Sequence, residues 1–167
     1  MTSANGETVE VINTDAEGRL ALCDALAWAQ KQWEPEAIID IATLTGACAI
    51  ALGSGLAGLF CDDEETASKI VAAGKAAGEN FWRLPLWKPY AKELRSEVAD
   101  IKHTGSREGG AIVAALFLKH FIKPGVLWAH MDIAGVDWQS KASPLCPVGA
   151  TGFGALTLLA LSRGGLK

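Results

Sequence analysis

The chain has 167 residues, half of which are hydrophobic, and its formal net charge is −4. This length suffices for one ordinary globular domain with a sizeable core and leaves no room for a second full domain. The mild acidity and the lack of a lysine or arginine run exclude the clustered positive charge that nucleic acids and anionic membranes attract, so we expect small-molecule or protein partners.

The first half of the chain is predicted to alternate between strands and helices. Residues 8–12 are predicted to form a strand, and apolar residues at helical spacing predict a helix over 18–33. Residues 37–42 form a nearly continuous apolar run, which is typical of a strand buried on both faces. This order of elements is the beginning of an α/β pattern.

Residues 41–60 carry no charge, and about 20 such residues would suffice to cross a bilayer as a helix. Glycines and hydroxyl side chains interrupt this stretch, so we expect no membrane span. Its glycines also fit the G-x-G-x-x-G dinucleotide-binding pattern over 53–58. This pattern can bind a pyrophosphate only where it lies between a strand and the start of a helix. Because a strand-like run at 59–61 and four acidic residues follow, we predict a turn before a strand instead.

The second half continues the alternation. Asp62 is predicted to begin a helix, with Glu65 as its capping-box partner and Gly78 as its stop. A short helix is predicted over 90–94 and a strand over 98–101. The helix predicted over 111–121 is almost wholly apolar and therefore buried, and it is followed by a strand over 126–133 and a last helix over 155–161. The pattern predicts an α/β fold with a mixed, largely parallel β-sheet and helices on both faces, a three-layer αβα arrangement.

The cysteines are scattered and form no C-x-x-C pair: Cys23, Cys48, Cys61 and Cys146. In a chain too large to depend on disulfides for its core, such usage is typical of a reducing compartment. The first twenty residues show no basic start followed by an apolar core and a small-residue cleavage site, so we expect no signal peptide. The sequence therefore predicts a cytoplasmic protein.

The stretch NTDAEGRL, from Asn13 to Leu20, places two carboxylates and a guanidinium at every second position. One interpretation is a capping box, in which Thr14 and Glu17 close the first turn of the following helix. The other takes the segment as extended, which would point Asp15, Glu17 and Arg19 into one space. Paired carboxylates after a strand suit divalent cations, but two carboxylates alone do not make a metal site, and the spacing leaves both interpretations open.

NTDAEGRL resembles the signature octapeptide of the leucyl (cytosol) aminopeptidases, which are dinuclear zinc exopeptidases. The resemblance continues along the whole chain, in the order of that family, through six further blocks: DIATLTGA (40–47), ALGSG (51–55), RLPLW (83–87), GGAIVAALFLKHF (109–121), WAHMDIAG (128–135) and GATG (149–152). An octapeptide with six supporting blocks is far more specific than the glycine pattern above. The chain is therefore identified, by resemblance, as part of the catalytic domain of that family.

The resemblance implies roles for two segments. Asp15 and Glu17 would bind two divalent metal ions, zinc in the family with manganese or magnesium as alternatives, and Arg19 would be the catalytic residue that holds a bicarbonate as proton shuttle. The turn after the next strand resembles the substrate-binding loop of the family, and its residues here are Thr43, Leu44 and Gly46. Backbone groups of the last two would bond the peptide substrate.

The resemblance also implies that parts of the site are missing. The remaining ligands of the family, a lysine and two aspartates, and its catalytic lysine lie upstream of the octapeptide, whereas this chain has only fourteen residues before Asp15. His103 and His130 are weak substitutes as zinc ligands, and Asp132 is expected to be structural. We therefore expect residues 1–167 to be the C-terminal portion of the catalytic domain, without the N-terminal domain and the upstream part.

Such a portion is expected to be inactive alone, although the family releases leucine-like N-terminal residues from peptides as a hexamer. Two other classes of protein remain open. A binding or scaffold protein that keeps the fold without the chemistry would account for the missing ligands, and elemental analysis for metal would separate it from an enzyme. A small nucleotide-binding α/β module rests only on the glycine pattern, and a thermal-shift titration with NAD would test it.

Overall fold

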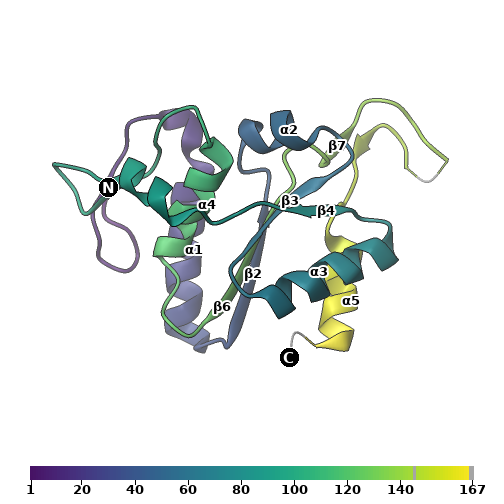
Figure 1. Ribbon diagram of the computed structural model, residues 1–167, viewed down its shortest axis with the longest axis horizontal. Coiled ribbons are helices and arrows are strands. Elements are labelled where there is room, and N and C mark those ends of the chain that lie inside the picture. The colour runs from purple at the N-terminus through teal and green to yellow at the C-terminus, as the bar shows by residue number, and fades with distance from the viewer. Residues whose placement is uncertain (145, 166–167) are drawn as a thin grey trace. The chain divides into compact units, whose positions relative to one another are not determined.

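The computed structural model describes residues 1–144 and 146–165 (Figure 1). The chain divides into two compact units, each assembled from two separate stretches. Unit 1 comprises Met1–Ile38 and Pro85–Trp128, and unit 2 comprises Ile39–Leu84 and Ala129–Lys167. Each unit is therefore held together by contacts between residues far apart in the sequence.

Unit 1 is built around two helices, α1 (Gly18–Trp33) and α4 (Gly110–His120), which pack against each other. α4 also packs against the 3-10 helix η2 (Lys88–Leu94). Most residues of α4 are buried, as its almost wholly apolar sequence requires. A short parallel strand pair, β1 (Val9–Glu10) with β5 (Ile101–Lys102), joins the two stretches of the unit.

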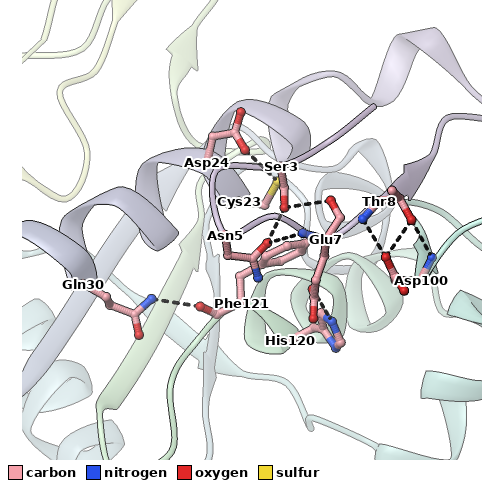
Figure 2. Close-up of polar contacts among 10 residues, drawn as sticks. All are labelled: Ser3, Asn5, Glu7, Thr8, Cys23, Asp24, Gln30, Asp100, His120 and Phe121. Carbon is pink, nitrogen blue, oxygen red and sulfur yellow. Dashed lines mark hydrogen bonds and ion pairs between the residues drawn. The ribbon is translucent and has the colours of Figure 1, made fainter.

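Polar side chains fasten the N-terminal segment to the rest of unit 1 (Figure 2). The carboxylate of Glu7 lies 2.8 Å from His120 Nε2. Asp100 accepts hydrogen bonds from the backbone N–H and the hydroxyl of Thr8, at 2.8 and 2.6 Å. Because these two bonds favour the carboxylate, they lower the pKa of Asp100. Buried Gln30 of α1 donates a further bond, at 2.8 Å, to the backbone carbonyl that follows α4.

The main sheet has four strands in the order β2 (Ala37–Ala42), β6 (Leu127–Asp132), β3 (Ala57–Cys61) and β4 (Phe81–Arg83). β2 and β6 begin in unit 1 and continue into unit 2. β3 is parallel to β4 and antiparallel to β6. The backbone hydrogen bonds at the two ends of the β2–β6 pair show that residue numbers increase in the same direction along both strands, so this pair is parallel. The predicted α/β fold with a mixed sheet is confirmed.

The core of unit 2 lies around β3, in which every residue is buried. α3 (Glu64–Ala77) packs against β3, β4 and α5 (Ala155–Gly164), and α2 (Gly46–Leu52) packs against β3. A two-stranded antiparallel ribbon pairs β7 (Trp138–Gln139) with β8 (Gly149–Ala150). The buried strand thus supports the helices that surround it in this unit.

A buried carboxylate links the end of α3 to the start of α5. Gly78 ends α3 in the left-handed conformation, as predicted, and Glu79 follows it. The carboxylate of Glu79 accepts bonds from the backbone N–H and the hydroxyl of Thr157, at 2.9 and 2.5 Å. Thr157 lies in the first turn of α5, whose N-cap residue is Gly154 and therefore has no side chain to offer. Glu79 supplies the acceptor that this helix start needs.

Several predicted boundaries are confirmed. The helix predicted at 18–33 is α1, and the buried helix predicted at 111–121 is α4 displaced by one residue. The strand at 37–42 has the predicted bounds, but its predicted burial on both faces is wrong. Asp40 is buried, whereas the other residues of β2 are half-buried, because β2 lies at the edge of the sheet.

Other predictions are corrected by the structure. The strand predicted at 98–101 begins only at its last residue, because Ser96 Oγ accepts bonds from the Val98 and Ala99 amides, at 3.1 and 3.0 Å, and bends the chain. The helix predicted to start at Asp62 is capped instead by Asp63, which accepts from the Thr66 amide at 2.7 Å. The sequence patterns did not predict β4 or α2. Within the described ranges, no helix is long and apolar enough to cross a membrane.

Candidate active site

The segment from Asn13 to Leu20, here called the signature segment, is neither an extended strand nor a capping box. Asn13 is extended, and its side chain accepts a bond from the Asp15 amide at 3.0 Å. Residues Thr14–Ala16 form a turn of 3-10 helix, η1, and Glu17, the N-cap of α1, has helical torsion angles. Both sequence interpretations are therefore wrong in geometry, because the Asn13 side chain supplies the acceptor and starts the turn one residue earlier.

The charged side chains of the signature segment differ in how deeply they are buried. Asp15 and Glu17 are exposed, whereas Arg19, in the first turn of α1, is only 7% exposed. An extended strand would have placed all three on one face. Two carboxylates thus remain accessible at the start of α1 while the guanidinium lies inside unit 1.

His103 contacts the signature segment at both ends. Its imidazole is fully buried, with Nε2 2.8 Å from the Asn13 carbonyl oxygen and Nδ1 3.1 Å from the Glu10 carbonyl oxygen. Arg19 Nη1 donates to the backbone carbonyl of His103 at 2.9 Å. Since both ring nitrogens face carbonyl oxygens, the geometry does not favour the zinc-ligand alternative for this histidine.

The candidate substrate loop, Thr43–Gly46, leads from β2 into α2 within unit 2. Asp132, at the end of β6, accepts bonds from the Leu44 amide at 3.1 Å and from the Thr45 amide and hydroxyl at 3.4 and 2.7 Å. Thr45 is also the N-cap of α2, accepting from the Cys48 amide at 3.0 Å. The structural role predicted for Asp132 is confirmed, because its buried carboxylate holds this loop.

A close approach of two segments lies behind the same loop. Cys48 of α2 is buried, and a Cβ built on Gly58 of β3 would lie 2.6 Å from its Sγ atom, so only glycine fits there without displacement. Burial, and secondarily the Asp132 carboxylate, raise the pKa of Cys48 to about 12. Burial likewise raises the pKa of Cys23 on α1 to about 12, with a smaller contribution from Asp24.

A buried ionisable pair was missed by sequence reasoning. His130 Nδ1 lies 2.5 Å from the Asp40 carboxylate, and the His130 ring stacks on Phe60 with centroids 6.0 Å apart. The only local signals were polar residues within two apolar strands, Asp40 in one and His130 and Asp132 in the other. The pairing of β2 with β6 brings Asp40 and His130 together, and a local pattern cannot show that.

The described residues supply part of a metal site at most. Across residues 1–144 and 146–165 no group of three or more His, Cys, Asp and Glu side chains could hold a metal ion. Asp15 and Glu17 are a suitable donor pair for a divalent cation, because both carboxylates are exposed within one turn. They fit a site whose other ligands come from elsewhere in a longer protein.

Comparison with known proteins gives the class and then the family. A sequence model described as "Cytosol aminopeptidase family, catalytic domain" matches residues 1–159. The match covers most of the chain, so its α/β fold is of the class of aminopeptidase catalytic domains. The chain is a member of the cytosol aminopeptidase family.

Individual relatives agree with that assignment. A protein of Desulfovibrio desulfuricans named "Probable cytosol aminopeptidase" is 69% identical over 164 residues, which cover 98% of this chain and 33% of the relative. A protein of Nitratidesulfovibrio vulgaris with the same name is 57% identical, covering 99% of this chain and 33% of the relative. The solved structure of a tomato leucine aminopeptidase mutant superposes with a TM-score of 0.90 at 46% identity, over 96% of this chain and 31% of that chain. The chain spans about a third of the length of these relatives.

Proposed function

We propose that the complete protein containing this chain is a metal-dependent aminopeptidase that releases leucine-like N-terminal residues from peptides. The observation that carries the proposal is the signature segment, in which Asp15 and Glu17 are exposed at the start of α1 while Arg19 is buried. Membership of the cytosol aminopeptidase family supports this reaction class.

Asp15 and Glu17 would hold part of a site for two divalent metal ions, zinc with manganese or magnesium as alternatives. Carboxylate oxygens bind such cations and can bridge two of them. When bound, the metal would supply an activated water and polarise the scissile carbonyl. The remaining ligands would come from protein beyond the described residues, because the relatives are about three times as long as this chain.

Arg19 would hold bicarbonate, which would serve as the general base. A guanidinium stays charged at all working pH values and binds planar oxyanions through paired N–H donors. The bond from Arg19 Nη1 to the His103 carbonyl fixes the direction of the group. Arg19→Ala should therefore leave metal bound, lower kcat and abolish stimulation by added bicarbonate.

The loop Thr43–Gly46 would bind the peptide substrate through its backbone. The Leu44 amide already donates to Asp132, so Leu44 would use its carbonyl oxygen to accept a bond from the substrate. Gly46 is the first residue of α2, where backbone amides have no intrahelical acceptor and can donate outward. Thr43 is exposed beside them.

The complete protein would be a cytoplasmic homo-oligomer, a hexamer as in the family, with no nucleic-acid partner. Large apolar side chains that this chain leaves exposed support an assembly: Trp28 and Trp33 of α1, which form an edge-to-face pair with centroids 5.0 Å apart, and Ile50 of α2. Light scattering on the complete protein would measure the assembly, and a concentration-independent monomer would contradict it.

The central experiment compares two carboxylate variants in the complete protein. Glu17→Gln removes one proposed ligand charge and should abolish turnover of a leucine anilide and lower the metal content measured by elemental analysis. Glu65→Gln is the matched control, since Glu65 is an exposed carboxylate in the first turn of another helix, paired with Lys69. It should leave both quantities unchanged.

Retention of metal and turnover by Glu17→Gln would refute the metal assignment and favour the scaffold alternative. The nucleotide-binding alternative finds no support in the fold, because the glycine pattern at 53–58 leads from α2 into β3, from helix to strand. Residues 1–167 alone should show no turnover, because no group of three or more potential ligands comes together within the described residues. Zinc-dependent turnover by the isolated chain would contradict that expectation.

A further inference from the structure

We propose that His103 is a positioning residue for the signature segment. Its imidazole ties the first residue of the turn that carries Asp15 to the end of β5, and its backbone carbonyl fixes the guanidinium of Arg19. The inference rests on the function proposed above for Asp15, Glu17 and Arg19. His103 itself would touch neither substrate nor metal.

The contacts of His103 follow the chain along the signature segment. Its backbone N–H donates to the Glu10 carbonyl at 3.1 Å, and its ring Nδ1 lies 3.1 Å from the same oxygen. Its ring Nε2 lies 2.8 Å from the Asn13 carbonyl, and its own carbonyl accepts from Arg19 at 2.9 Å. One buried residue thus contacts the strand before the segment, its first residue and its buried arginine.

The signature segment has little other means of holding its position. Each residue of η1 is exposed or half-buried, and Ile12, just before it, is 52% exposed. A turn with so little apolar burial is positioned mainly by hydrogen bonds. The side-chain bond from Asn13 shapes the turn locally, whereas the bond between its carbonyl and His103 ties it to the end of β5, 90 residues away.

The chemistry of the contacts explains why a histidine is suited to this position. The Asn13 carbonyl oxygen only accepts hydrogen bonds, so the ring nitrogen that faces it must carry the N–H. Leucine has similar bulk and no donor, so the Asn13 carbonyl would keep only its local bond from the Ala16 amide and would lose the bond that ties the turn to the end of β5. Glutamine can return one amide donor near the position of Nε2, the atom that faces Asn13.

A displaced turn should affect chemistry more than substrate binding. The carboxylates of Asp15 and Glu17 would lie in altered positions, and misplacement of a site by about 1 Å can lower the rate by about a hundredfold. The loop Thr43–Gly46 has its own anchor in Asp132, so its backbone groups would be unaffected. We therefore expect kcat to fall while KM changes little.

The test uses the complete protein with four variants: His103→Leu, His103→Ala, His103→Gln and, as control, His120→Gln. The control replaces a half-exposed histidine of the same unit that pairs with Glu7. For the Leu and Ala variants we expect kcat to fall at least about tenfold with KM within about twofold, metal occupancy to fall at limiting metal, and amide exchange over residues 13–19 to accelerate. His103→Gln should recover most of kcat, and the control should behave as wild type.

The outcomes separate this inference from the function on which it rests. If Glu17→Gln abolishes activity but His103→Leu keeps wild-type kcat, metal occupancy and exchange, the positioning role alone is overturned. If the Leu and Ala variants both fail to fold, or lose stability with the active-site quantities unchanged, His103 is only a structural residue and the proposal is overturned as well. If Glu17→Gln keeps metal and activity, the proposed function itself fails.

Discussion

Two turns of this chain lead from a strand into a helix and carry the residues of the proposed site, and they are held by opposite chemistry. In unit 1, the imidazole of His103 brings an N–H donor to the Asn13 carbonyl oxygen of the signature segment. In unit 2, the carboxylate of Asp132 brings acceptors to the amides and hydroxyl of the loop Thr43–Gly46. In both cases one buried side chain from a distant part of the sequence defines the turn.

The difference between the two anchors is one of charge. A buried carboxylate that accepts several bonds forms stronger interactions than a ring that donates one bond to a neutral carbonyl. Asp132 also accepts from the Ala134 amide at 3.2 Å, so it orders its own strand end together with the loop. Stability should therefore depend more on the loop of unit 2 than on the signature segment, although the proposed chemistry depends on both.

Replacement of Asp132 is expected to give the largest loss of stability. Asp132→Ala removes a buried acceptor and leaves the Leu44 amide and the Thr45 hydroxyl without it, which should lower the free energy of unfolding by about 3 kcal/mol. Urea denaturation of the complete protein would measure the change, with Asp137→Ala, near the same strand, as the control. A loss below about 0.5 kcal/mol would show that Asp132 does not anchor the loop.

A matched pair of threonine variants should distinguish the two turns. Thr45→Ala removes the N-cap of α2 and should cost about 1 kcal/mol of stability. Thr14→Ala changes an exposed threonine beside the true cap, Asn13, and should cost less than about 0.5 kcal/mol. Equal losses in thermal or urea unfolding would restore the capping-box interpretation of the signature segment.

The reactivity of the buried thiols is expected to show the smallest effect. Because burial raises the pKa of Cys23 and of Cys48 to about 12, both should resist alkylation at pH 8 while half-buried Cys146 reacts. Asp132→Asn should lower the pKa of Cys48 and leave that of Cys23 unchanged. Rates of iodoacetamide labelling from pH 8 upward, with Cys146→Ser as control, would measure both. Rapid labelling of Cys48 in the folded wild type would contradict this expectation.

The same thiols give stability a defined pH dependence. In the folded state their pKa lies above the ordinary value of 9.0, so the folded state retains the proton longer than the unfolded state does. Their contribution to stability should be complete below pH 9 and should be lost as the pH rises towards 12. Urea midpoints measured from pH 8 to 10.5 should begin to fall above pH 9, and less so in Cys48→Ala.

Local patterns predicted the elements that local forces determine. α1 and α4 follow from apolar periodicity and from a continuous apolar run, and Gly78 follows from the need for a left-handed residue at a helix end. The choice of Asp63 over Asp62 as cap depends on backbone angles that the letters do not contain. The three residues of β4 are too few to produce a pattern.

The candidate site remains a prediction from the motif, and the structure corrects its expected geometry. The motif named Asp15, Glu17 and Arg19, but their conformation depends on whether Asn13 or Thr14 supplies the first acceptor. That choice is supported by His103, which the sequence places far from the segment. Contacts of this kind arise from the pairing of distant strands, so neither spacing nor composition could have indicated them.

The carboxylate of Glu79 makes the last helix dependent on much earlier parts of unit 2. α5 begins at a glycine cap and receives its acceptor from a residue 78 positions before Thr157. Because this acceptor is so distant in the sequence, we expect α5 to be a late element in folding. Glu79→Ala should therefore speed unfolding and leave the folding rate nearly unchanged in stopped-flow experiments. An equal slowing of folding would instead place this contact in the folding nucleus.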